Sequence, residues 1–68
     1  MRIEINGEPR NVEDESYLSD LVGELSLTPE RVAIELNKEV VRRTDWATTP
    51  VTEGDRIEIV QFVGGGCC

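Results

Sequence analysis

Residues 53–66, with the sequence EGDRIEIVQFVGGG, decide the fold and the point at which the chain leaves it. Glu53-Gly54-Asp55 is typical of a turn, because glycine and aspartate tolerate the backbone angles that turns require. Residues 56–63 then carry apolar side chains in a period-2 pattern, which predicts a half-buried strand. On such a strand Ile57 and Ile59 lie on one face, and we expect that face to cover a core.

The opposite face of this strand carries Val60 and Phe62, directly before the glycines. Phe62 is the only phenylalanine in the chain. An exposed aromatic side chain beside a functional end is typical of a docking surface. A side chain that merely covers the open side of the sheet is an equally good interpretation. Both residues are therefore candidates for partner docking.

The strand is followed by a glycine-rich tail, Gly64-Gly65-Gly66-Cys67-Cys68. Glycine loses more backbone entropy on ordering than any other residue, so we expect a flexible tail. Five extended residues reach roughly 16–18 Å. Three of them lack side chains, so the tail could pass through a channel that admits only backbone. Such a tail suits the delivery of a C-terminal carboxyl into the active site of another enzyme. A frayed end is the plain alternative, but the glycines follow the strand without a linker. We therefore divide the chain into a domain, residues 1–63, and a tail, residues 64–68.

The N-terminal part of the chain predicts a hairpin. Residues 2–5 alternate apolar and polar side chains, as a half-buried strand does. Asn6-Gly7 is a strong hairpin signal because both positions tolerate positive φ. Residues 10–12 would form the returning strand, and Pro9 places its start near an edge of the sheet.

A helix is predicted next. Ser16 is a candidate N-cap, and acidic residues before it favour the positive end of the helix dipole. Thr28-Pro29 would end the helix. Its apolar stripe follows the spacing i, i+3, i+4 and i+7: Leu18, Leu21, Val22 and Leu25.

Two more strands follow the helix. Residues 32–36 alternate again, Asn37-Lys38 supplies a turn, and residues 39–42 form a short strand. Thr44-Asp45-Trp46-Ala47 predicts a single helical turn that carries Trp46 onto the core. The resulting order is strand, strand, helix, strand, strand, strand. It predicts an α+β fold of the β-grasp (ubiquitin-like) type, a mixed sheet of about five strands with one main helix packed on one face.

The composition and charge of the chain exclude several classes of function. The 68 residues carry 14 acidic and 7 basic side chains, a formal net charge of −7, and no histidine. Phosphate backbones and anionic membranes repel such a chain, so we expect neither nucleic-acid nor membrane binding. An acidic surface suits a basic protein partner, and it also simply keeps a protein soluble. No apolar run approaches the length of a membrane span and no basic leader precedes one, so we expect a cytoplasmic protein.

The sequence offers no catalytic site. It has no histidine and no phosphate-binding loop motif, and a domain this small has little room for a deep pocket. Adjacent Cys67 and Cys68 cannot cross-link a fold, and two thiols are too few for a zinc site. We therefore expect neither catalytic residues nor a metal or cofactor, and a carrier or co-substrate rather than an enzyme.

The chain resembles the thiamin-biosynthesis sulfur carrier family, ubiquitin-like proteins that end in two or three glycines. The resemblance covers essentially the whole chain. Four stretches carry it: residues 5–8 (INGE), 32–41 (VAIELNKEVV), 43–46 (RTDW) and 53–66.

The resemblance implies a mechanism and partners. An E1-like activating enzyme would use ATP to adenylate the terminal glycine carboxylate. A persulfide from a cysteine desulfurase or another donor would then convert it to a thiocarboxylate, and thiazole synthase would accept the sulfur. Carried over by position, Gly66 would bear the sulfur, with Gly64 and Gly65 threading the active sites of the partners.

The chain departs from the family at its end, because Cys67-Cys68 follow Gly66 and leave it no free carboxylate. Our first hypothesis is that a peptidase trims both cysteines, and our second is that they are redox-active and carry sulfur as persulfides. Other functions also stay open: a sulfur carrier for another pathway, such as molybdopterin or cysteine synthesis, or a ubiquitin-like protein modifier. A metal or redox delivery protein would rest on the two cysteines alone.

Overall fold

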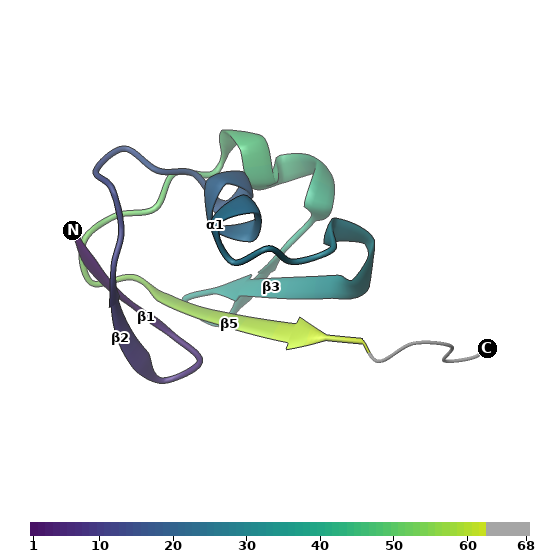
Figure 1. Ribbon diagram of the computed structural model, residues 1–68, viewed down its shortest axis with the longest axis horizontal. Coiled ribbons are helices and arrows are strands. Elements are labelled where there is room, and N and C mark those ends of the chain that lie inside the picture. The colour runs from purple at the N-terminus through teal and green to yellow at the C-terminus, as the bar shows by residue number, and fades with distance from the viewer. Residues whose placement is uncertain (63–68) are drawn as a thin grey trace.

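The computed structural model describes residues 1–62, and the predictions for residues 63–68 lie outside that range. Five strands, one α-helix and two short 3₁₀ segments make up the described chain (Figure 1). In chain order they are β1 (Arg2–Ile5), β2 (Glu8–Asn11), α1 (Leu18–Glu24), a 3₁₀ turn (Pro29–Arg31), β3 (Val32–Leu36), β4 (Glu39–Val41), a 3₁₀ segment (Arg43–Thr48) and β5 (Arg56–Gln61).

The five strands form one mixed sheet in the order β2-β1-β5-β3-β4. The first and last of these elements in sequence, β1 and β5, run parallel side by side at its centre, and the other neighbours are antiparallel. Helix α1 and the Arg43–Thr48 segment lie on one face of the sheet, and the other face is open (Figure 1). This arrangement confirms the predicted β-grasp fold.

The core lies between α1 and the covered face of the sheet. Five large side chains are essentially fully buried there: Ile3, Leu18, Leu21, Ile34 and Ile57. Each such side chain contributes roughly 1.5–3 kcal/mol of burial free energy. Trp46 is buried as predicted, and its indole Nε1–H donates to the carbonyl of Val41 over 3.0 Å. That bond satisfies the polar group of a buried aromatic side chain.

Both predicted hairpin turns are present. Asn6 and Gly7 have φ values of 53° and 82°, and Asn37 and Lys38 have φ values of 52° and 73°. Two successive residues with positive φ define the type I′ turn, whose twist matches that of the strands it joins. Asparagine adopts this conformation more readily than most residues, which is why it precedes both reversals.

The helix begins one residue later than predicted and ends sooner. Tyr17, not Ser16, is the N-cap, and its backbone N–H donates to the Asp20 carboxylate over 2.8 Å. Ser16 is buried, and its hydroxyl donates to the carbonyl of Glu13. The N-cap prediction was wrong because a serine that bonds backward along the chain cannot also cap the helix ahead of it.

The helix ends at Glu24 rather than at Thr28-Pro29, so the predicted stripe residue Leu25 is the C-cap. Ser26 follows with a φ of 57°, and the N–H of Leu27 donates back to the carbonyl of Val22. This is the Schellman end of a helix, in which serine occupies the position that glycine usually takes. The proline therefore stands well past the true helix end.

The strand bounds differ slightly from the predicted ones. Strand β2 begins at Glu8 and ends at Asn11, so it includes Pro9, which pairs with Glu4. Because β2 is an edge strand, a residue without an N–H is tolerated there, as predicted. Strand β4 ends at Val41, one residue short of the prediction.

Candidate functional site

Strand β5 presents opposite faces to the core and to solvent. Ile57 is 1% exposed and packs in the core, and Ile59 is partly buried against it. Val60 and Phe62 are 53% and 56% exposed. The predicted division of this strand into a core face and an open face is therefore confirmed: Val60 lies on the open face, and Phe62 is exposed one residue past the end of the strand.

The exposed apolar side chains extend beyond β5. Val60 pairs with Ala33 on β3, and Val40 on the adjacent β4 is 72% exposed. Strand alternation puts these side chains on the same open face. We call Ala33, Val40, Val60 and Phe62 the open-face patch. Exposed apolar side chains grouped on one face are typical of a surface that meets another protein.

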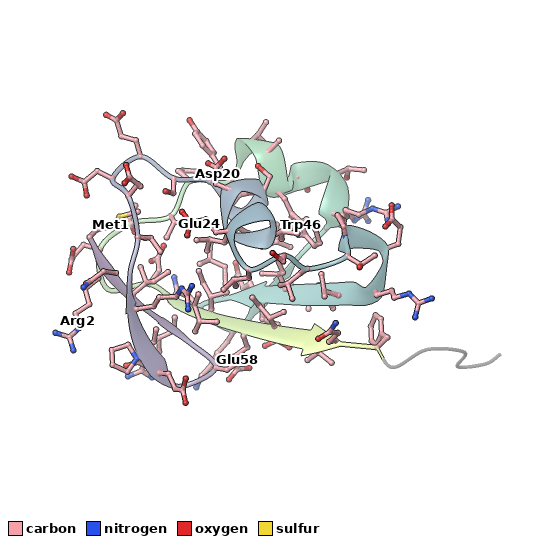
Figure 2. All side chains as sticks on the ribbon, viewed as in Figure 1. Met1, Arg2, Asp20, Glu24, Trp46 and Glu58 are labelled. Carbon is pink, nitrogen blue, oxygen red and sulfur yellow. The ribbon has the colours of Figure 1, made fainter. Side chains whose placement is uncertain are left out.

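Acidic side chains lie beside this patch. Glu35 on β3 pairs with Val40 on β4 and with Glu58 on β5, and Glu58 lies two residues before Val60, so both carboxylates stand on the open face beside the patch. Figure 2 shows Glu58 and the buried Trp46 on opposite sides of the sheet. Like charges directly opposite each other on neighbouring strands are destabilising. The patch therefore carries a local excess of negative charge, in keeping with the net charge of the chain.

The end of β5 is held from both sides. On the β3 side, the N–H of Phe62 donates to the carbonyl of Arg31 over 2.7 Å. On the β1 side, the side-chain amide of Asn6 bonds to the backbone of Ile59: Oδ1 accepts from the Ile59 N–H over 2.8 Å, and Nδ2 donates to the Ile59 carbonyl over 3.3 Å. Strand β5 ends at Gln61, short of the predicted end at Val63, and a backbone hydrogen bond on the β3 side still holds Phe62.

The residues predicted to carry and thread the chemistry, Gly64, Gly65 and Gly66, lie outside the described residues, as do Cys67 and Cys68. The structure describes the residues that precede them: β5, the two docking candidates, and the hydrogen bonds from this segment to both neighbouring strands. Within residues 1–62 no group of three or more metal-ligating side chains is close enough to hold an ion. No helix in that range is long and apolar enough to cross a membrane.

A shallow groove on the covered side runs between the hairpin and the segment after α1. Leu25 and Leu27 line it from the segment after α1, and Ile5, Ile59 and Gln61 line it from the sheet. Its lining also includes a carboxylate and a guanidinium, from Glu8 and Arg10. None of these groups forms the nucleophile and base pair that a catalytic site requires.

Sequence reasoning missed the contribution of Asn6. Asn6-Gly7 predicted a turn, which is correct. The side-chain amide of Asn6 also forms the hydrogen bonds that a longer β1 strand would have offered to the backbone of Ile59. The signal was present in the sequence as an asparagine before each of two predicted reversals. Its meaning depends on the position of β5 beside β1, which local patterns do not contain.

A five-stranded β-grasp domain whose last strand leads into a glycine-rich segment defines the class of ubiquitin-like carrier domains. The sequence model of the ThiS family matches residues 3–66, nearly the whole chain. The chain belongs to the ThiS family. The matched segment ends at Gly66, so Cys67 and Cys68 lie beyond the part shared with the family.

Individual relatives agree with this assignment. The thiamine biosynthesis protein ThiS of Geobacter metallireducens, known from a crystal structure, superposes with a TM-score of 0.84 at 35% identity, over 97% of this chain and 100% of that one. The sulfur carrier protein ThiS of Bacillus subtilis is 36% identical over 53 residues, 78% of this chain and 80% of the relative.

A third relative is much longer. A thiazole synthase of Magnetococcus marinus is 46% identical over 66 residues, which is 97% of this chain but only 20% of that protein. The chain therefore spans about a fifth of the length of this relative.

Proposed function

We propose that this protein is a sulfur carrier of thiamin biosynthesis, which bears sulfur as a thiocarboxylate on Gly66 and delivers it for thiazole formation. The observation that carries the proposal is the match to the ThiS family over residues 3–66, which includes the glycine run. Relatives named sulfur carrier protein ThiS favour this pathway over the molybdopterin and protein-modifier alternatives.

The chemistry assigns the catalysis to partners. A carboxylate oxygen of Gly66 attacks the α-phosphorus of ATP on an E1-like enzyme, and pyrophosphate leaves. A persulfide sulfur from a cysteine desulfurase or another donor then attacks the acyl carbon, and AMP leaves. A thiol reduces the resulting S–S bond, so that the carrier keeps a thiocarboxylate and the two other sulfurs form a disulfide. The carrier supplies the acyl group and the surface by which it is held.

Thiazole synthase is the proposed acceptor. A protein named thiazole synthase contains a segment 46% identical to this chain, which supports a functional connection between the two activities. Within the carrier, we propose that Val60 and Phe62 contact both the activating enzyme and the acceptor. Their exposure, and their position directly before the glycines, support this role. A large aromatic side chain among smaller exposed apolar side chains can serve as the anchor of a binding surface.

We further propose that a peptidase removes Cys67 and Cys68 before activation. The end of the family match at Gly66 supports this proposal. Neither Gly64 nor Gly65 carries a side chain, so only backbone would enter the active site of the activating enzyme behind the reacting carboxylate.

Intact mass spectrometry tests the proposal. Three chains are compared in the presence of ATP, the activating enzyme and a persulfide donor: one ending at Gly66, one ending at Gly65, and the full chain. The Gly66-ended chain should gain one oxygen-for-sulfur exchange, and the other two should not. If the full chain gained sulfur and the double variant Cys67→Ser/Cys68→Ser did not, the cysteines rather than Gly66 would carry the sulfur.

A further inference from the structure

Two asparagines form side-chain hydrogen bonds at the two ends of β5. Asn6 and Asn37 each begin a type I′ turn with a φ close to 50°. The side chain of Asn37 accepts from the N–H of Arg56 over 3.0 Å, at the start of β5. The side chain of Asn6 bonds to both backbone groups of Ile59, near its end. The molecule therefore contains a matched pair of turn residues, one at each end of the same strand.

The Asn6 contact compensates for a short neighbour. Strand β1 pairs with β5 only through Glu4 with Arg56 and Ile5 with Ile57, and the hairpin then turns back. The backbone of Asn6 continues this ladder by donating to the carbonyl of Ile57 over 2.8 Å. A strand that went on in parallel would offer Ile59 one acceptor and one donor. The amide side chain of Asn6 offers both.

Beyond Ile59 the support comes from one side. Val60 pairs with Ala33, and Phe62 bonds to the carbonyl of Arg31, both on the β3 side. The two docking candidates therefore stand just past the last contact on the β1 side. Loss of that contact would leave the final residues of β5 attached along a single edge, and such an edge frays more readily than a strand paired on both sides.

We infer that Asn6 is a positioning residue, whose side-chain amide keeps the end of β5 in the conformation in which Val60 and Phe62 meet the partner enzymes. The inference rests on the proposed function, because the docking role of that segment belongs to it. A surface that must be ordered on binding loses binding free energy equal to the entropic cost of ordering, whereas a preformed one does not. Asn37 holds the opposite end of the strand, where no docking residue lies.

The test compares Asn6→Gly with Asn37→Gly. Glycine keeps the positive φ of each turn and removes only the side-chain bonds, so backbone strain does not separate the variants. We expect the Asn6→Gly chain, ended at Gly66, to raise the KM for the carrier in thiocarboxylate formation by about five- to tenfold, with kcat unchanged. Asn37→Gly should change the KM by less than about twofold. The two variants should lower the melting temperature by similar amounts.

Two further readouts keep the outcome clear. Asn6→Asp retains the acceptor for the Ile59 N–H, so its KM should lie close to the wild-type value. If the added negative charge alone set the KM, this variant would differ from wild type instead. Hydrogen exchange of the Phe62 amide should be faster in Asn6→Gly and unchanged in Asn37→Gly, and it needs no activity. Equal KM values for the two glycine variants, or unchanged exchange at Phe62, would overturn the inference. A wild-type chain that forms no thiocarboxylate would overturn the proposed function, and the exchange readout would still test the role of Asn6 at the end of β5.

Discussion

The two faces of β5 differ in what they contribute, although they are formed by alternate residues of one short strand. Ile57 is fully buried beneath α1, whereas Val60 on the open face is 53% exposed, and Phe62, just past the end of the strand, is 56% exposed. Burial of an apolar side chain stabilises the fold, whereas an exposed one gains free energy only when a partner covers it. The comparison teaches that stability and recognition occupy separate sets of side chains on this strand. Single substitutions should therefore separate them.

The largest expected effect comes from the covered face. Ile57→Ala should lower the free energy of unfolding by about 2–5 kcal/mol, because it removes buried methyl groups and leaves a cavity. For a domain of 68 residues, with a total stability of roughly 3–10 kcal/mol, this is a large share. Urea denaturation followed by circular dichroism measures it.

Ile57→Val serves as the graded control, because it removes one methylene and should lose only about 0.5–1.5 kcal/mol. If Ile57→Ala lowered stability by no more than Ile57→Val, the assignment of this face to the core would be wrong.

The open face should respond in the opposite way. Phe62→Ala should leave the free energy of unfolding within about 1 kcal/mol of wild type, since the ring is more than half exposed. It should weaken binding to the activating enzyme at least about tenfold, as loss of an aromatic anchor does. Isothermal titration calorimetry with the unmodified carrier measures the affinity without the chemistry.

Val40→Ala is the matched control for Phe62→Ala. Val40 is even more exposed and lies on the same face, but on the edge strand β4 rather than at the end of β5. Its truncation should change the affinity by less than about threefold, as most residues outside a hot spot do. Equal losses for the two variants would mean that the partner recognises the whole patch rather than the end of β5.

The two faces of β5 could be predicted from the sequence because strand alternation is a local property. The spacing of residues 56–61 alone predicts that Ile57 and Val60 lie on opposite faces of the strand. The turns were equally predictable, since Asn6-Gly7 carries its preference for positive φ in its own chemistry. The order of elements then left few arrangements other than a β-grasp sheet.

Two of the failures were local, where more than one nearby residue could cap or end the helix, and the third depended on a contact between distant segments. Ser16 has the chemistry of an N-cap, but its hydroxyl bonds to Glu13 while Tyr17 and Asp20 form the helix start. The helix end escaped prediction because Ser26, rather than a glycine, adopts the left-handed conformation there. The bonds from Asn6 to Ile59 join residues 53 positions apart, and only the pairing of β1 with β5 reveals them.

The smallest expected effect concerns charge on the open face. Glu35 and Glu58 are direct neighbours across β3 and β5, so Glu58→Gln should raise the free energy of unfolding by about 0.2–1 kcal/mol. The gain should shrink in high salt, which screens repulsion between exposed charges. Urea denaturation at low and at high ionic strength measures both.

Glu13→Gln is the control for this last comparison, because it removes the same charge from an exposed loop residue whose carboxylate faces no strand partner. It separates local repulsion between Glu35 and Glu58 from the general effect of a net charge of −7. Equal gains for both variants would assign the effect to net charge alone. A gain confined to Glu58→Gln would show that the open face gives up stability to keep two carboxylates together. Such a loss is reasonable on a surface that meets a basic partner, because complementary charge raises the rate and specificity of docking.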